Sequence, residues 1–310
     1  MSTAGLVSFP VLVSVVIPTH NPHAGRLARA LAALRAQSLP APHWETVIVD
    51  NASQPSITSV SAGPDNLRLV REPTLGLTMA RRRGLRESRG EFVVMVDDDN
   101  ALAPDYLERV LAHFAANPRI GALGGRSVPE FEVEPPAWVR EFDDLLACRD
   151  LGSAPLISAP ETREYPTFAP IGAGMALRRA AVQRWLEDAS SGNLPDRRGT
   201  ALTSSGDNDI IFTVLRSGWQ VAYFPDLTLT HLIPASRLQP DYLARLNRGI
   251  QKSWQQVLLR HGAASWPVIP PWTVPLRQAK AWFAYRAWSS PAARIRWHGA
   301  CGHFEGRAAS

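Results

Sequence analysis

Short apolar runs that end in polar residues alternate with amphipathic segments along the first third of this chain. The apolar runs predict strands buried on both faces, at residues 11–18, 46–49, 67–70 and 91–96. The amphipathic segments predict helices at residues 27–34, 77–88 and 104–114. Because regular alternation of strands and helices is typical of βαβ units, we predict an α/β fold built on a parallel sheet.

The second half of the sequence is less regular. Eight prolines interrupt residues 121–203 and predict mostly loops there. We expect a strand at 171–177 with a helix after it through Trp185, and, beyond the loops, a helix at 209–217, strands at 221–224 and 227–231, and an amphipathic helix at 243–258.

Cysteine content and hydropathy restrict the cellular setting. Cys148 and Cys301 alone cannot make a disulfide scaffold, so reduced thiols in the cytosol are the simpler interpretation. No run reaches the roughly 18 uncharged apolar residues that a membrane-spanning helix needs. The first 16 residues lack the basic and small-residue features of a signal peptide. We therefore expect a cytoplasmic protein.

The net charge of +5 is unevenly distributed. Residues 241–310 hold ten Lys/Arg against two Asp/Glu, whereas residues 1–240 hold 23 against 26. Six of the ten tryptophans also lie in this basic tail. Such a tail predicts an anionic partner, and peripheral contact with the inner face of the cell membrane is one hypothesis, plain packing against the body the other. Nucleic acid is not expected, because no nucleic-acid-binding motif accompanies the charge.

Three adjacent carboxylates, Asp97, Asp98 and Asp99, follow the strand predicted at 91–96. Ligands of open α/β sheets bind beyond the carboxyl ends of the strands, and adjacent carboxylates repel one another unless a cation is present. Mg²⁺ and Mn²⁺ prefer oxygen ligands and often bind through carboxylates and substrate phosphates. The triplet thus predicts a divalent-cation site, the alternative being an acidic cap on the helix that follows.

Two further groups are less specific. Asp207 and Asp209 precede a helical segment, where acidic residues also serve as ordinary N-caps. His231 follows a short predicted strand and is either a metal or phosphate ligand or a buried structural histidine.

Taken together and in order, these motifs resemble the family-2 glycosyltransferases of GT-A fold. An ordered set is far more specific than any one member. The motifs are Val16-Ile-Pro-Thr-His-Asn21, Val47-Ile-Val-Asp-Asn-Ala-Ser53, Gly76-Leu-Thr-Met-Ala-Arg-Arg-Arg-Gly84, Val96-Asp-Asp-Asp99, Gly124-Gly-Arg126, Gly172-Ala-Gly-Met175, Ser205-Gly-Asp-Asn-Asp209, Gly218-Trp219 and His231-Leu-Ile-Pro234.

The resemblance covers about residues 11–260 and implies a Rossmann-like, mostly parallel central sheet with flanking helices. It implies a GT-A catalytic domain over residues 1–240, with a nucleotide-binding half at about 11–120 and an acceptor-binding half at about 121–240. Residues 241–310 would then form a helical, Trp- and Arg-rich extension, interrupted by prolines into short helical pieces.

The resemblance also implies a nucleotide-sugar donor in the crevice. Thr19, Asn21 and Asp50 would lie around its base and ribose. Arg81 would lie near the base or the diphosphate, and Asp97 would contact the ribose.

The same resemblance implies the metal ligands and the general base. Asp99 would hold Mn²⁺ or Mg²⁺ on the diphosphate, as in the family's DXD motif, and His231 would assist. Asp207 matches the general base, but Gly206 stands where the family has a glutamate. The base assignment therefore lies between Asp207, which we prefer, and Asp209.

The expected reaction is transfer of a sugar, with inversion, from the donor to a hydroxyl of a glycan or lipid-linked acceptor, as in cell-envelope polysaccharide biosynthesis. Two alternatives are a nucleotidyltransferase, which would need an early Gly-rich basic signature, and a catalytically inactive GT-A domain that only binds nucleotide sugars. The missing glutamate is the one feature that favours the inactive domain.

Overall fold

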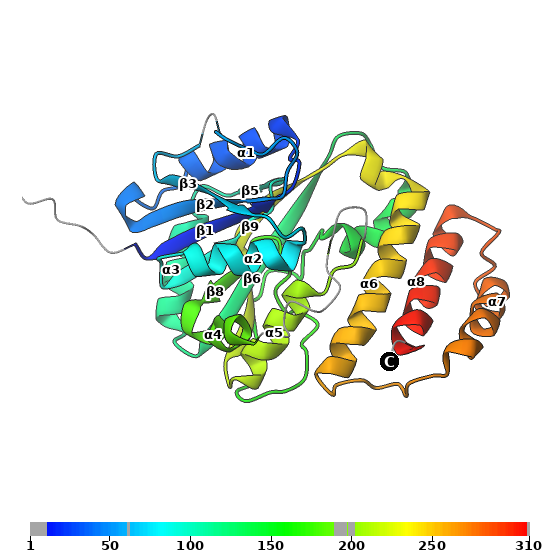
Figure 1. The fold of residues 1–310 in the computed structure, drawn as a ribbon. Coiled ribbons are helices and arrows are strands. Elements are labelled where there is room, and N and C mark those ends of the chain that lie inside the picture. The colour runs from blue at the N-terminus through cyan, green and yellow to red at the C-terminus, as the bar shows by residue number, and fades with distance from the viewer. Residues whose placement is uncertain (1–10, 61–62, 189–196, 198–201, 309–310) are drawn as a thin grey trace, which may run out of the picture.

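The centre of the molecule is a mixed sheet of nine strands within residues 11–60, 63–188, 197 and 202–308, which are the residues that this computed structural model describes (Figure 1). The strands run in the spatial order β3-β2-β1-β4-β8-β6-β9-β5, with β7 paired to β9. Their bounds are β1 Val13–Thr19, β2 Trp44–Asn51, β3 Leu67–Glu72, β4 Phe92–Met95, β5 Asn100–Leu102, β6 Ile120–Phe131, β7 Leu156–Ile157, β8 Ala176–Arg178 and β9 Gln220–Ile233.

Helices cover both faces of the sheet, as the α/β prediction requires. Apolar side chains of α1 and α3 pack on one face, and those of α2, α4 and α5 pack on the other. The bounds are α1 Ala24–Arg35, α2 Leu77–Glu87, α3 Tyr106–Ala116, α4 Arg179–Glu187 and α5 Gly206–Arg216. The α/β fold with flanking helices is therefore confirmed.

Strands β1 and β2 are buried along their whole length. Side chains alternate between the two faces, so Val15 and Ile17 join one hydrophobic core while Val16 joins the other. β-branched residues suit this position because they pack well on a pleated surface.

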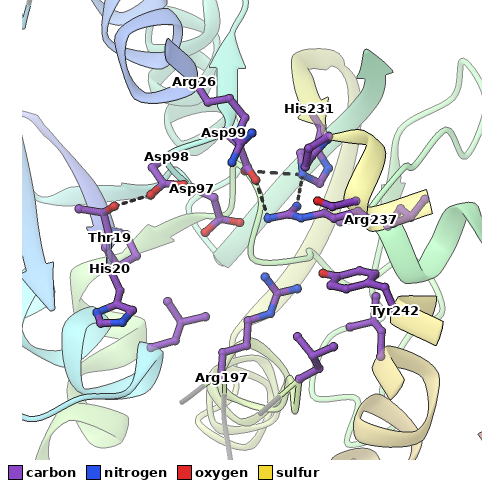
Figure 2. Close-up of a pocket in the computed structure, with 18 of the residues that line it drawn as sticks. Thr19, His20, Arg26, Asp97, Asp98, Asp99, Arg197, His231, Arg237 and Tyr242 are labelled. Carbon is purple, nitrogen blue, oxygen red and sulfur yellow. Dashed lines mark hydrogen bonds and ion pairs between the residues drawn. The ribbon is translucent and has the colours of Figure 1, made fainter. Parts of the chain in front are cut away.

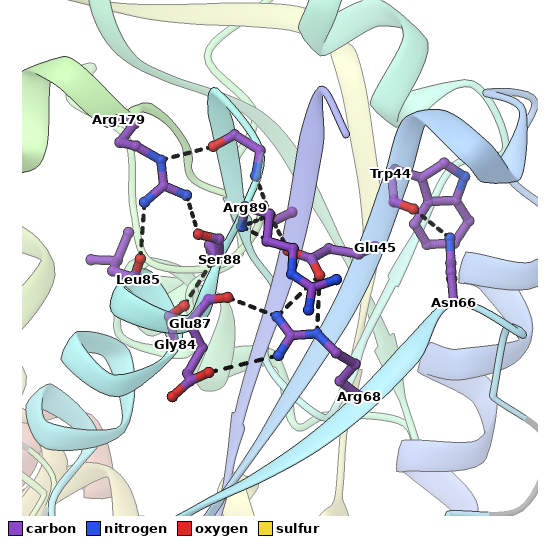
Figure 3. A network of polar contacts seen from close by, with 12 residues as sticks. Trp44, Glu45, Asn66, Arg68, Gly84, Leu85, Glu87, Ser88, Arg89 and Arg179 are labelled. Carbon is purple, nitrogen blue, oxygen red and sulfur yellow. Dashed lines mark hydrogen bonds and ion pairs between the residues drawn. The ribbon is translucent and has the colours of Figure 1, made fainter. Parts of the chain in front are cut away.

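A network of polar contacts fixes the amino ends of the parallel strands (Figure 3). The buried carboxylate of Glu45 accepts hydrogen bonds from Ser14 Oγ at 2.8 Å and from the Arg89 backbone N–H at 2.7 Å. Arg68 donates to the same carboxylate at 3.1 Å and to the Glu87 carbonyl at 2.7 Å. The network ties the starts of β1, β2 and β3 to the end of α2.

The opposite edge of the sheet collects the polar strand ends. β1 is parallel to both β2 and β4, and Thr19 lies in register with Asp50. The segment Asp97–Asp99 therefore leaves the sheet at the same edge as Thr19. This juxtaposition agrees with the placement expected from the sequence.

Two strand predictions were wrong. Residues 120–131 form the long strand β6 where the sequence predicts loops, and 221–224 and 227–231 belong to the single strand β9. The reason is close packing: a Cβ on Gly125 would lie 2.0 Å from the Leu227 carbonyl oxygen of the paired strand. Glycine in β6 thus marks close backbone approach rather than a turn. The strand expected at 171–177 is reduced to Ala176–Arg178.

The C-terminal extension is helical and lies beside the sheet domain (Figure 1). It comprises α6 Pro240–Arg260, α7 Val274–Ala284 and α8 Pro291–Ala308, so the expected short helices after α6 are confirmed. Its buried side chains share a core with η2 Ala137–Leu146 and with η4 Ala235–Leu238. Within the described residues, no helix combines the length and hydropathy needed to cross a bilayer.

Candidate active site

A pocket of about 430 Å³ opens at the carboxyl edge of the sheet, between the ends of β1 and β4 and the start of α6 (Figure 2). Acidic, basic and aromatic side chains share its wall. The lining residues include Thr19, His20, Arg26, Asn51, Asp97, Asp98, Asp99, Arg197, His231, Arg237 and Tyr242.

Asp98 is held at the pocket floor by its neighbour on β1. The Thr19 hydroxyl donates a hydrogen bond to Asp98 Oδ2. Burial, together with repulsion from the adjacent Asp99, raises the pKa of Asp98 to about 6, although the Thr19 hydrogen bond opposes the rise. The triplet therefore contains one carboxyl group whose charge is costly in this structure and which added positive charge would stabilise.

Asp99 is buried and paired with one side chain of β9 and one of η4. Its Oδ2 lies 2.8 Å from Arg237 Nη2, and its Oδ1 lies 3.5 Å from His231 Nε2. Burial disfavours the Asp99 carboxylate, but hydrogen bonding to His231 and the charge of Arg237 outweigh it and hold the pKa well below the ordinary range. Asp99 is thus ionised under all ordinary conditions.

Arg237 is a residue that sequence reasoning missed. It lies on η4, three residues after the His231-Leu-Ile-Pro234 motif, and its Nη1 is 3.1 Å from His231 Nε2. Nothing in the neighbouring residues signals this contact, because an arginine that follows a strand is ordinarily solvated. Arg26 and Arg197 also line the pocket, so three guanidinium groups surround the aspartates.

The donor set fits a divalent cation that arrives with a phosphate ligand. The Asp97 carboxylate faces the pocket, and Asp99 and His231 lie beside it (Figure 2). In the described part of the chain, no three imidazole, thiol or carboxylate groups could hold an ion by themselves. Mg²⁺ typically takes one or two protein carboxylates and completes its shell with phosphates and water, so such an ion would draw most of its ligands here from substrate and solvent.

The predicted donor residues fall into two groups. Thr19 and Asp97 line the pocket, whereas Asn21, Asp50 and Arg81 do not. Asp50 is buried and accepts backbone hydrogen bonds from Ser53 at 3.1 Å and from residue 57 at 3.2 Å, with Arg71 Nη1 2.5 Å away. Burial alone would raise the pKa of Asp50, but these donors stabilise the ionised carboxylate more strongly, so the pKa of Asp50 is lowered.

Asn21 organises the loop beside Asp50. Its backbone N–H donates to Ser53 Oγ at 2.9 Å, and its Oδ1 accepts from the Gln54 backbone N–H at 2.9 Å. Both residues therefore shape the loop after β2 and do not line the pocket.

Arg81 and Asp207 meet at Gly172. The Gly172 backbone N–H donates to Asp207 Oδ2 at 3.0 Å. A Cβ on Gly172 would lie 2.5 Å from Arg81 Nη2 and 3.3 Å from Asp207 Oδ2, so both side chains rest against this glycine. The motif Gly172-Ala-Gly-Met175 thus brings the first turn of α5 to the buried guanidinium of α2.

Asp209 lies elsewhere. It is 1% exposed, and its Oδ2 accepts a hydrogen bond from Trp185 Nε1 at 2.7 Å. Its Oδ1 is 2.8 Å from His261 Nε2 and 3.3 Å from Arg260 Nε. Asp209 therefore joins α5 to α4 and to the end of α6, and both of its carboxylate oxygens are engaged in these contacts.

A mixed α/β sheet that gathers carboxylates and guanidinium groups at the carboxyl ends of its parallel strands is typical of enzymes that bind phosphate-bearing substrates. The comparison with protein families makes this specific: the model described as "Glycosyl transferase family 2" matches residues 14–186, more than half of the chain. The chain belongs to this family.

Curated relatives carry related names. The chain is 25% identical over 256 residues to an N-acetylglucosaminyltransferase of Mesorhizobium japonicum, with 80% of this chain and 57% of that protein covered. It is 23% identical over 267 residues to one of Bradyrhizobium diazoefficiens, covering 83% and 51%. The chain thus spans about half the length of these relatives.

Solved structures support the fold. The mannosyltransferase PcManGT from Pyrobaculum calidifontis, in complex with GDP-Man and Mn²⁺, matches with a TM-score of 0.59 at 22% identity, covering 97% of this chain and 87% of that one. S. aureus TarS 1–349 matches with a TM-score of 0.52 at 14% identity, covering 96% and 90%. At these identities the likeness establishes the GT-A fold.

Proposed function

We propose that this protein is an inverting glycosyltransferase that moves a sugar from a nucleoside-diphosphate donor to a hydroxyl group of a glycan or lipid-linked acceptor. The observation that carries the proposal is the pocket at the carboxyl edge of the sheet, where Asp97, Asp98 and Asp99 face Arg26, Arg197 and Arg237. Family membership supports the reaction class, and this mixed charge suits a donor with a diphosphate and a polar sugar.

In this proposal the arginines bind the diphosphate and Asp97 binds the ribose. Three guanidinium groups offer planar, charge-assisted donors that match phosphate oxygens. Asp98 lines the same pocket, and its pKa is raised by burial and by Asp99. When ionised, its carboxylate balances part of the positive charge of the three arginines. Tyr242 and the loop that holds Asn21 and Asp50 would shape the space for the sugar and the base.

The proposal includes dependence on Mn²⁺ or Mg²⁺ held by Asp99, with Asp97 and His231 beside it. When bound, the ion would act as a Lewis acid and stabilise negative charge on the leaving diphosphate. The contacts of Asp99 support this assignment, because His231 and Arg237 lower the pKa of this buried carboxyl, and an ionised carboxylate is a good ligand for a hard cation. Arg237 holds that carboxylate in place at 2.8 Å.

Asp207 is the proposed general base. Its carboxylate is fixed by the Gly172 backbone N–H, and a group in this role takes the proton of the attacking acceptor hydroxyl. Direct attack of that hydroxyl on the anomeric carbon inverts its configuration. A retaining mechanism would need a second carboxylate as nucleophile. Asp209 does not supply it, because its carboxylate is engaged with Trp185 and His261.

Of the two alternatives, the nucleotidyltransferase does not agree with the family match. The inactive domain is supported only by Gly206 and predicts binding without turnover. An active transferase is distinguished from the inactive domain by incubation of the protein with a panel of nucleotide sugars and Mn²⁺, with release of nucleoside diphosphate as the readout. Donor binding seen as a thermal shift with no release, with or without glycan acceptors, would favour the inactive domain.

We also propose a cytoplasmic enzyme of cell-envelope polysaccharide synthesis that contacts the inner face of the membrane peripherally. The exposed aromatic and basic side chains of the C-terminal extension support this location. A lipid-linked acceptor would be reached from such a position.

A further inference from the structure

The outer face of α7, continued by the turn η5 Pro271–Thr273 before it, carries the most exposed of the large apolar side chains in the described residues. Trp272 is 74% exposed, Leu276 67% and Phe283 68%. With Ala279 they repeat at intervals of four, three and four residues, which places Leu276, Ala279 and Phe283 along one side of α7, while Trp272 continues the same spacing on η5. Contiguous exposed apolar patches of this kind mark interaction sites.

The opposite face of α7 is firmly held. Trp297 Nε1 of α8 donates to the Gln278 carbonyl at 3.0 Å, and Gln278 Nε2 donates to Glu305 at 2.9 Å. Trp282 packs edge-on against Trp297 with ring centroids 4.8 Å apart. The outer stripe is therefore presented in a fixed orientation rather than exposed by a loosely attached helix.

Three cations flank the stripe, and none of them pairs with a carboxylate among the described residues. They are Arg277, Lys280 and Arg286, all exposed. On α8, by contrast, Arg296 pairs with Glu141 at 2.5 Å. The one carboxylate of residues 263–308, Glu305, is engaged by Arg248 and Gln278. The outer face of α7 is thus apolar and positive with no counter-charge.

We propose that this face, defined as Trp272, Leu276, Ala279 and Phe283 with Arg277, Lys280 and Arg286, binds the surface of a lipid bilayer that carries anionic headgroups. Apolar side chains of a surface helix enter the boundary between headgroups and acyl chains, while basic residues attract anionic lipids. The proposal deepens the peripheral location given above and names the surface that makes the contact.

Charge favours a bilayer over a second copy of the chain. A two-fold dimer through this face would bring the same three unpaired cations toward their own copies, where like charges repel. An anionic bilayer supplies the missing counter-charge. α7 also lies on the far side of α8 from α6, whose Tyr242 and Leu246 line the donor pocket (Figure 1). Bilayer contact therefore leaves that pocket accessible.

The test is cosedimentation of the full chain with vesicles of phosphatidylcholine alone or mixed with phosphatidylglycerol, at low salt. Wild type should pellet with the mixed vesicles and remain in solution with phosphatidylcholine. One variant combines Trp272→Ser, Leu276→Ser and Phe283→Ser. Its matched control combines Val133→Ser with Ile157→Ser, which changes exposed apolar residues of the sheet domain.

A second variant neutralises the charge by Arg277→Gln, Lys280→Gln and Arg286→Gln. At about 1 kcal/mol per cation, its partition coefficient should fall on the order of 10²-fold, and added salt should weaken wild type likewise. The matched control neutralises three exposed arginines of the sheet domain, Arg35, Arg119 and Arg163, and should bind like wild type.

Circular dichroism melts identify any variant that fails to fold. Equal pelleting of both α7 variants and wild type would overturn the proposal, as would absence of binding by wild type. A concentration-dependent doubling of mass in solution without vesicle binding would assign the face to a second copy instead. Release of nucleoside diphosphate with a soluble acceptor should be unchanged in both variants, so failure of this proposal and failure of the glycosyltransferase assignment are separately visible.

Discussion

The two aspartates at the start of α5 should respond in opposite ways to the same isosteric change. In Asp209→Asn, one oxygen that accepts a hydrogen bond becomes an NH₂ group that donates one. Trp185 Nε1 lies 2.7 Å from one side of this carboxylate and His261 Nε2 lies 2.8 Å from the other, with Arg260 at 3.3 Å. Whichever way the amide turns, a buried donor meets another donor.

The magnitude follows from burial. Asp209 is 1% exposed, and breaking a buried ion pair by removal of one partner costs about 3–5 kcal/mol. Asp207→Asn keeps an oxygen for the Gly172 backbone N–H and removes no buried ion pair, so its cost should stay within about 1.5 kcal/mol. For activity the order reverses: loss of a general base should reduce the transfer rate on the order of 10²- to 10⁴-fold in Asp207→Asn.

Urea unfolding followed by tryptophan fluorescence gives the stability of each variant, and release of nucleoside diphosphate at low temperature gives the activity of the folded fraction. Thermal shift with the donor should show unchanged donor affinity in Asp207→Asn, because the base acts on the acceptor. If Asp209→Asn folds with wild-type stability and loses transfer while Asp207→Asn keeps it, the assignment of the two residues is refuted.

Three further predictions follow from local geometry. Gly172→Ala should displace the Arg81 guanidinium, which is only 2.5 Å from the new Cβ, and lower kcat/KM on the order of 10²-fold with little change in melting temperature; an unchanged kcat/KM would contradict this. Burial raises the pKa of the Cys148 thiol to about 12 and that of Cys301 to about 11, so Ellman's reagent at pH 8 should label neither thiol until urea is added, and rapid native labelling would be the contrary result. The pKa of Asp50 is lower in the folded protein than its ordinary value of 3.8, so the ionised carboxylate stabilises the folded state at higher pH, and this stability is lost as the pH falls through the folded-state pKa. The difference in unfolding free energy between wild type and Asp50→Asn should therefore shrink below about pH 4, and urea titrations that find it constant would disprove the linkage.

The sequence predicted most of the sheet edge that carries the pocket. Apolar runs ending in polar clusters gave β1, β2 and β4, and parallel pairing then placed Thr19 and Asp97 at the same edge, as the structure has them. These features depend on local periodicity and on the general rule for strand ends, so a single sequence is enough.

Other parts depended on contacts that local sequence does not encode. β6 was missed because Gly125 is required by the approach of Leu227 from β9, a partner about a hundred residues away in the chain. Arg237 was missed because its role depends on a 2.8 Å pairing with Asp99, a residue far away in the sequence. The separate positions of Asp207 and Asp209 likewise follow from Trp185 and His261, which no spacing within the motif reveals.

The central claim is that the pocket lined by Asp97, Asp99 and Arg237 binds a nucleotide sugar with a divalent cation. The most direct measurement is release of nucleoside diphosphate from a panel of nucleotide sugars, for wild type and for Asp99→Asn, each with Mn²⁺ and with EDTA. The account predicts that at least one donor is turned over by wild type with Mn²⁺, that EDTA abolishes this turnover, and that the folded Asp99→Asn protein shows none. Full turnover in EDTA, or by the Asp99→Asn protein, would contradict it.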